Sequence, residues 1–330
     1  MKRGLWLLAC ALLAAALVPL LLGGSGLWER LRTFPPGLLL AMLGMILVGW
    51  NLNALRLRLL LVGRPMGQGR ALGVVMATEF AICATPAGAG GPLTLMALLM
   101  RHGLRPAQGT AIFTVEQLGD LLVFACALLG IFCYALFNAL SSRLGWMLGA
   151  SLLLLISGLT LAFLLAWNHR RLLRICGHLL ARLGVPWRRR VHWGRKVLGF
   201  RNALQDSLRL PRRVLLGVFV LTALHWLLRY SVLYLTLQGL GSTLPWAWTV
   251  LVQVLALGAG QLSLLPGGAG SAELASVALL APLVGKSSAA AAIIIWRGVT
   301  YYFYLIAGAP LFLHLAGRPL LRRLVRFRQS

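Results

Sequence analysis

The chain has 330 residues, of which 59% are hydrophobic, and its formal net charge is +26 because only six side chains are acidic. A soluble fold of this length could not bury so much apolar surface, so we predict an all-α integral membrane protein with one transmembrane domain, residues 1–330. The basic residues cluster between apolar stretches, which is typical of membrane topology and argues against a nucleic-acid partner.

Six apolar stretches are long enough to cross about 30 Å of hydrocarbon as helices rising about 1.5 Å per residue. The first follows Lys2 and Arg3 but is longer than the apolar core of a signal peptide, so we expect it to be retained as a span. The six predicted spans are 4–23, 37–55, 107–137, 146–167, 214–238 and 288–313.

Two further apolar regions, 71–100 and 247–285, are each interrupted near the middle by a break rich in glycine and proline. The breaks are Pro86–Pro92 (PAGAGGP) and Pro266–Glu273 (PGGAGSAE), and they begin 180 residues apart. Each half is short for a full crossing, and backbone can leave a helix at membrane depth only where protein or a polar cavity satisfies it. We therefore predict two re-entrant helical hairpins whose tips approach each other. Kinked or short spanning helices are the alternative.

The basic residues orient this arrangement. If each hairpin begins and ends on one side, 26 of the 32 Lys and Arg residues share the side of both termini and of the basic loop 168–213. The positive-inside rule makes that side cytoplasmic and places residues 239–245 outside. The first repeat, 37–137, then recurs upside down as 214–313, which is the inverted repeat of alternating-access transporters.

Several charged side chains fall within the apolar regions. A charge at mid-span costs about 2.5–3.5 kcal/mol even on the most lenient insertion scale, so such residues usually form pairs or line a cavity. Glu273 with Arg297, and Glu116 or Asp120 with Arg229, would form internal ion pairs. Alternatively Arg297 first, and Arg229 second, would bind an anionic head group, and both interpretations can hold together. Glu79 precedes the first break, and His225 lies one turn from Arg229.

Each break is followed by the start of a half-helix, whose free N–H groups and positive dipole end favour an anion. Glycine lets a phosphate approach the backbone, although the same glycines would also serve a tight turn and close packing. The candidate substrate-binding residues on these grounds are Pro86, Gly88, Gly90, Gly91, Glu116, Asp120, His225, Arg229, Pro266, Gly267, Gly268, Gly270, Glu273 and Arg297.

The second break, followed by Gly285, Arg297 and Tyr301-Tyr302, resembles the PGGxGxxE…G…R…Y signature of the lysylphosphatidylglycerol synthase transmembrane-region family, and the chain looks like a stand-alone YbhN-like member. The resemblance covers about residues 40 to 313. It implies a flippase-like domain of the bacterial inner membrane and adds Tyr301 to the candidate site. Many relatives carry an arginine where this chain has Gln117, a basic residue in place of Ala272, and an acidic residue near Gly91-Pro92.

We therefore expect a translocase for an anionic phospholipid or a modified phosphatidylglycerol-type lipid, working by alternating access around the two breaks. We expect no enzymatic activity, because bifunctional relatives carry the aminoacyl transfer in a soluble domain that follows the membrane part. The sequence has no Walker motif and no CxxC spacing, so we expect no cofactor and no metal. A membrane partner in lipid or glycolipid synthesis, catalytic or not, and a secondary transporter of a small anion are the alternatives. Homo-oligomerisation and association with a lipid-synthesis enzyme stay open.

Overall fold

The computed structural model describes residues 2–24, 26–61, 63–137, 142–167 and 209–317, apart from 262 and 264, together with 202 and 205. The predicted basic loop 168–213 therefore lies largely outside the described residues. The chain divides into two compact units. One combines Met1–His102 with Leu216–Ser330, and the other is Gly103–Leu215.

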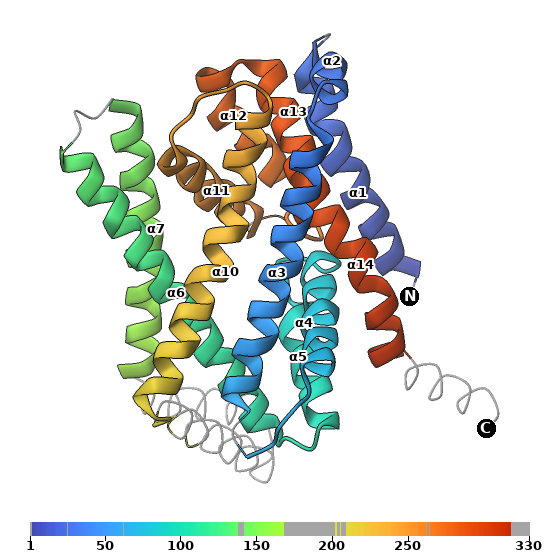
Figure 1. The fold of residues 1–330 in the computed structure, drawn as a ribbon, viewed down its shortest axis with the longest axis vertical. Coiled ribbons are helices and arrows are strands. Elements are labelled where there is room, and N and C mark those ends of the chain that lie inside the picture. The colour runs from blue at the N-terminus through green and yellow to red at the C-terminus, as the bar shows by residue number, and fades with distance from the viewer. Residues whose placement is uncertain are drawn as a thin grey trace, which may run out of the picture. The chain divides into compact units, whose positions relative to one another are not determined.

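All regular elements in the described part of the chain are helices (Figure 1), as expected where no water is present to satisfy backbone groups. Four of them are long and apolar enough to cross a membrane: Pro36–Leu60, Pro106–Tyr134, Arg212–Gly239 and Lys286–Leu315. The other two predicted spans coincide with α1 (Lys2–Gly23) and α7 (Ser142–Trp167), whose described residues contribute shorter apolar stretches. The chain is thus a multi-pass, all-helical membrane protein.

The first unit contains two long helices that pack through polar side chains, α3 (Pro36–Leu60) and α10 (Arg212–Gly239). The predicted span 37–55 is too short at its C-terminal end, because Arg56 continues the helix. Arg56 is buried, and its Nη1 donates a hydrogen bond to Thr222 Oγ1 of α10 at 3.2 Å. The helix therefore extends beyond the predicted span and includes Arg56: a hydrophobic-run criterion ends at the first arginine, whereas a partnered guanidinium can be buried.

Each region with a glycine break forms two short helices that pack against each other. The first region gives α4 (Gln68–Cys83) and α5 (Gly90–Arg101), and the second gives α11 (Trp246–Gln261) and α12 (Ser271–Val284). In the view of Figure 1 the α4–α5 pair lies below the α11–α12 pair. The longest of these helices have 16 residues, about 24 Å at 1.5 Å per residue, which is less than the hydrocarbon thickness.

A composite helix forms the centre of the first unit. It consists of α13 (Lys286–Arg297), the π-helical turn η1 (Gly298–Tyr302), α14 (Phe303–Phe312) and η2 (Leu313–Gly317). In its most apolar 18-residue stretch 67% of the residues are buried, against 33% in the corresponding stretch of α3 and 22% in that of α10. It packs against α1, α4 and α12, so it connects both pairs of short helices.

A short helix, α2 (Leu27–Arg32), occupies the segment between the first two predicted spans. Leu27 is buried against Ala290 and Ala291 of α13, and Arg30 Nε donates a hydrogen bond to Ser287 Oγ at 3.2 Å. The segment is too short and too polar for hydrophobic periodicity to indicate a helix, and tertiary packing supplies the stabilisation.

The second unit contains α6 (Pro106–Phe137), which agrees with the predicted span 107–137, and α7, and these two helices pack against each other. Glu116 is buried and Asp120 half-buried on α6.

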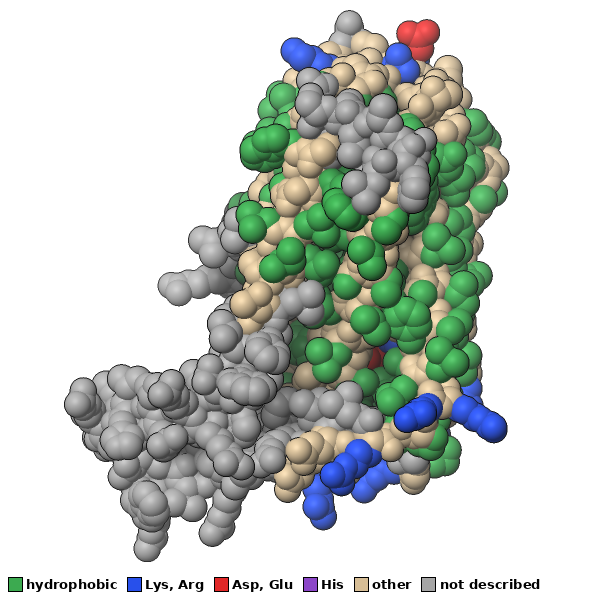
Figure 2. Space-filling model, turned by 90° about the vertical axis from the view of Figure 1, so that its left-hand side faces the viewer, with side chains coloured by type: hydrophobic (Ala, Val, Ile, Leu, Met, Phe, Trp, Pro, Cys, Tyr) green, Lys and Arg blue, Asp and Glu red, His purple; other side chains and the backbone are tan. Residues whose placement is uncertain are grey.

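Figure 2 shows a face of the molecule covered mainly by hydrophobic side chains, with Lys and Arg side chains gathered at its upper and lower edges. This distribution is typical of a protein whose sides contact lipid.

Candidate functional site

The two glycine-rich turns meet. Pro86 and Pro266, which lie at equivalent positions 180 residues apart, form an antiparallel β-bridge. The Gly267 N–H donates a hydrogen bond to the Thr85 carbonyl oxygen at 3.5 Å. Proline has no N–H to donate, so the two prolines can pair only through their carbonyls and their neighbours. The predicted approach of the two tips is confirmed.

The first turn, between α4 and α5, is held by an uncharged side chain. Thr85 Oγ1 donates to the Ala81 carbonyl oxygen at 2.6 Å and accepts from the Gly90 N–H at 2.8 Å. The hydroxyl therefore caps the start of α5. Thr85 is not among the predicted site residues, because its bond to Gly90 spans five residues and matches no local capping pattern.

The second turn, between α11 and α12, requires glycine for two reasons. Gly267 and Gly268 have φ angles of 64° and 68°, a region that side chains with a Cβ rarely adopt. A Cβ at Gly268 would also lie 2.7 Å from the Cα of Gly260 in the last turn of α11. The interpretation of these glycines as packing residues is thus sufficient to account for them.

Glu273 is the acidic centre of the second turn. Its Oε2 accepts the Gly270 N–H at 2.6 Å and so caps the start of α12, while its Oε1 lies 2.6 Å from Arg297 Nε. The two side chains are 0% and 5% exposed. The predicted pairing of Glu273 with Arg297 is confirmed, and the positive end of α12 already faces a carboxylate of the protein itself.

Aromatic side chains surround Arg297. Its guanidinium carbon lies 5.3 Å from the ring centre of Tyr301 and 5.2 Å from that of Trp296. The Tyr301 hydroxyl donates a hydrogen bond to the Pro266 carbonyl oxygen at 3.3 Å. Tyr301 and Arg297 therefore tie the central helix to the second turn from two directions, at the point where η1 interrupts the regular helix. π-Helical turns of this kind are frequent at functional sites.

Arg229 of α10 forms a second polar centre. Its Nη1 donates a hydrogen bond to the Tyr304 hydroxyl at 2.6 Å and lies 4.0 Å from Glu79 Oε2 on α4. Glu79 is not among the predicted site residues. Glu116 and Asp120, which we expected as partners of Arg229, belong to the other unit, and their pairing with Arg229 stays a prediction.

The two polar centres differ in exposure. The side chains of Arg229 and Glu79 are 20% and 16% exposed, whereas Arg297 and Glu273 are almost completely buried. The 4.0 Å separation of the first pair also contrasts with 2.6 Å in the second. Arg229 is therefore the more accessible of the two arginines, and its carboxylate partner is farther away.

His225 lies away from the turns, between α10 and α3. Its Nδ1 is 3.1 Å from the Gly49 carbonyl oxygen and its Nε2 is 3.3 Å from Asn53 Nδ2. A neutral imidazole that donates from Nδ1 and accepts at Nε2 satisfies both contacts. His225 thus contributes to the packing of two helices.

A family profile described as "Lysylphosphatidylglycerol synthase TM region" matches residues 6–308. The match includes both glycine-rich turns, both ion pairs and Tyr301. None of the curated proteins searched matches the chain.

Proposed function

Because the chain belongs to the lysylphosphatidylglycerol synthase transmembrane-region family, we propose that it moves an anionic phospholipid between membrane leaflets. The substrate would be a phosphatidylglycerol-type lipid, modified or not, and the membrane the bacterial inner membrane. The chain would translocate this lipid without altering it chemically. Both termini would face the cytoplasm, in agreement with the distribution of Lys and Arg.

In this proposal six helices cross the membrane and the two pairs of short helices are re-entrant hairpins, related by an inverted repeat. The pairs α4–α5 and α11–α12 would enter from opposite sides and end at mid-membrane. The bridge between Pro86 and Pro266 supports this arrangement, because residues at equivalent positions of two inverted repeats come together on the axis that relates the repeats.

The observation that carries the proposal is this contact between the two turns. Among the described residues, one backbone hydrogen bond, from Gly267 to Thr85, links them. A hydrogen bond contributes about 0.5–1.5 kcal/mol net, so the contact can open at low cost. We infer that the turns separate and rejoin as access alternates, and that the head group passes between them while the acyl chains stay in lipid.

Arg229 is the better candidate to bind the head-group phosphate. Its side chain is partly exposed, and its carboxylate partner is 4.0 Å away, so an anion could compete for the guanidinium. Arg297 is held at 2.6 Å by Glu273 and buried, which suits a residue that positions the second turn. This order reverses the expectation from sequence, which put Arg297 first.

Reconstituted vesicles provide the test. Phosphatidylglycerol and phosphatidylcholine, each with a fluorescent acyl chain, are incorporated in both leaflets, and an impermeant reductant bleaches the outer one. We expect the protein to make the inner pool of phosphatidylglycerol accessible faster than that of phosphatidylcholine. Arg229→Gln should slow this movement about tenfold or more, which corresponds to about 1.4 kcal/mol.

Arg58→Gln is the matched control, because Arg58 is exposed and bonds to Gln68, which is not part of either turn. It should leave the rate unchanged. If the folded protein moves neither lipid, or moves both at the same rate, the translocase proposal fails. A role as a membrane partner in lipid synthesis then becomes the better interpretation.

A further inference from the structure

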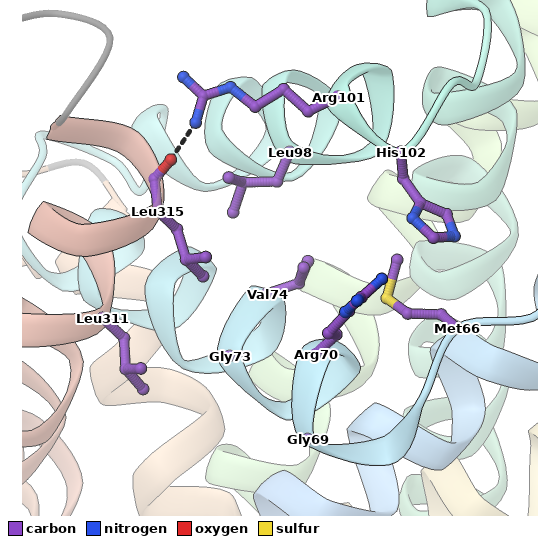
Figure 3. Close-up of a pocket in the computed structure, with 10 residues that line it drawn as sticks. All are labelled: Met66, Gly69, Arg70, Gly73, Val74, Leu98, Arg101, His102, Leu311 and Leu315. Atoms are coloured by element: carbon purple, nitrogen blue, oxygen red, sulfur yellow. Dashed lines mark hydrogen bonds between the residues drawn. The ribbon is translucent and has the colours of Figure 1, made fainter.

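A pocket of about 360 Å³ lies at the end of the α4–α5 pair that is remote from the glycine-rich turns. It is bounded by the start of α4, the end of α5 and the last turns of the central helix (Figure 3). Its lining residues are Met66, Gly69, Arg70, Gly73, Val74, Leu98, Arg101, His102, Leu311 and Leu315.

The pocket has a cationic end and an apolar end. In Figure 3, Arg70 from α4 and His102 from the end of α5 point toward each other on one side. Leu98, Leu311 and Leu315 lie toward the other side. At the rim, Arg101 donates a hydrogen bond to the Leu315 carbonyl oxygen, so α5 is tied to η2 there.

This division of charge matches one class of ligand. Guanidinium and imidazole N–H groups donate hydrogen bonds to phosphate oxygens, and leucine side chains bind methylene groups. A water-soluble anion would make no use of the apolar end, and a neutral apolar ligand would make none of the cationic end. The volume lies in the range of small-ligand sites, about 300–1,000 Å³, and accommodates a head group with the beginning of its chains.

We propose that this pocket binds the phosphate and the first methylene groups of an anionic phospholipid, whose remaining chain length lies along the apolar surface outside. The binding rests on the pocket alone. Its role in transport rests on the proposed function. A lipid would first bind in this pocket, at the end of the α4–α5 pair remote from the turns, and its head group would then move to the turns.

Two glycines of α4 make the pocket testable. A Cβ at Gly69 would meet no atom within 4 Å, and a Cβ at Gly73 would lie 3.4 Å from Leu315 Cδ1. Gly69→Leu therefore adds an apolar side chain at the lining of the pocket, where its Cβ has room, and leaves the charge unchanged. Gly44→Leu is the matched control, because Gly44 lies in α3, outside the pocket, and a Cβ there also meets nothing within 4 Å.

Native mass spectrometry of the purified protein in a neutral detergent measures the binding. The probes are dihexanoyl phosphatidylglycerol, dihexanoyl phosphatidylcholine and glycerol phosphate. We expect phosphatidylglycerol to bind most tightly, and Gly69→Leu and Arg70→Gln each to weaken it about tenfold or more. Gly44→Leu should leave its Kd unchanged. The same losses are expected in an Arg229→Gln background, in which the site near the turns is weakened.

An unchanged Kd for phosphatidylglycerol in folded Gly69→Leu would overturn the assignment, and so would equal affinity for either of the other two probes. Gel filtration and the melting temperature establish that each variant is folded. If Gly69→Leu does not fold, Arg70→Gln decides the question, since Arg70 is an exposed side chain. If the unaltered protein binds phosphatidylglycerol in this pocket but moves no lipid between leaflets, the proposed function fails and the pocket assignment stands.

Discussion

Glu273 and Arg297 form a buried ion pair in which the carboxylate has two partners, the Arg297 guanidinium at 2.6 Å and the Gly270 N–H at 2.6 Å. One oxygen neutralises a cation and the other caps a helix. The pair therefore joins α12 to the central helix at the level of the second glycine-rich turn, and each partner makes the burial of the other acceptable.

We predict that removing one partner of this ion pair lowers the free energy of unfolding by more than the pair itself contributes to it. Glu273→Ala and Arg297→Ala should each lower the free energy of unfolding by about 3–5 kcal/mol, because each leaves a charge unpaired in a dry site. The double variant should lose clearly less than the two single losses added together. Denaturation of the purified protein in detergent measures the double-mutant cycle.

The control cycle uses Glu29→Ala and Arg58→Ala, both at exposed positions on different helices. These two changes should add within about 0.5 kcal/mol. If the losses at Glu273 and Arg297 were equally additive, the two residues would not act as partners in the folded protein.

Gly268→Ala should destabilise the protein. The φ angle of 68° disfavours alanine, and its Cβ would lie 2.7 Å from the Cα of Gly260. We expect a loss of more than about 1 kcal/mol, read as a lower melting temperature. Gly44→Ala should be neutral or slightly stabilising, because its Cβ meets nothing and alanine favours helix. Equal melting temperatures for both variants would contradict this account of the turn.

A disulfide between the two turns should stop transport. Cysteines in place of Pro86 and Pro266 would have Cβ atoms about 4.5–5.5 Å apart, as in an antiparallel pair, so a shift of about 1 Å brings them to the separation of about 3.5–4.5 Å in a disulfide. We expect oxidation of this double variant, made without the native cysteines, to abolish the movement of phosphatidylglycerol, and reduction to restore it.

Each single cysteine variant is the control for that experiment and should be indifferent to oxidant. Efficient cross-linking without any loss of transport would mean that the turns do not have to separate. Absence of cross-linking would argue against the contact between Pro86 and Pro266 itself.

Labelling from the two sides of the membrane tests the orientation. Ser242→Cys lies between α10 and α11 and is expected outside, whereas Pro65→Cys lies between α3 and α4 and is expected inside. An impermeant maleimide added to intact cells should label the first and not the second, and inverted vesicles should reverse the pattern. Labelling of Ser242→Cys from the cytoplasmic side alone would refute the orientation.

Hydrophobic run lengths and helix breakers were sufficient to place most of the helices. Long apolar helices are the stable form of a chain in lipid, and clusters of glycine and proline interrupt them. The spans and both breaks therefore follow from local composition. The C-terminal end of α3 could not be predicted from local composition, because Arg56 is buried through its hydrogen bond to Thr222, a residue 166 positions away. Helix α2 could not be predicted from local composition either, because its stability comes from packing on α13.

Partners of the polar side chains depended on the packing of distant helices. Glu273 and Arg297 could be matched in advance because each is the isolated charge of its region. The position of Glu79 beside Arg229, and the convergence of Arg70 and His102 on one pocket, required the three-dimensional arrangement. The physical reason is that hydropathy records how much a residue prefers lipid to water, whereas an ion pair or a pocket depends on which faces of which helices come together.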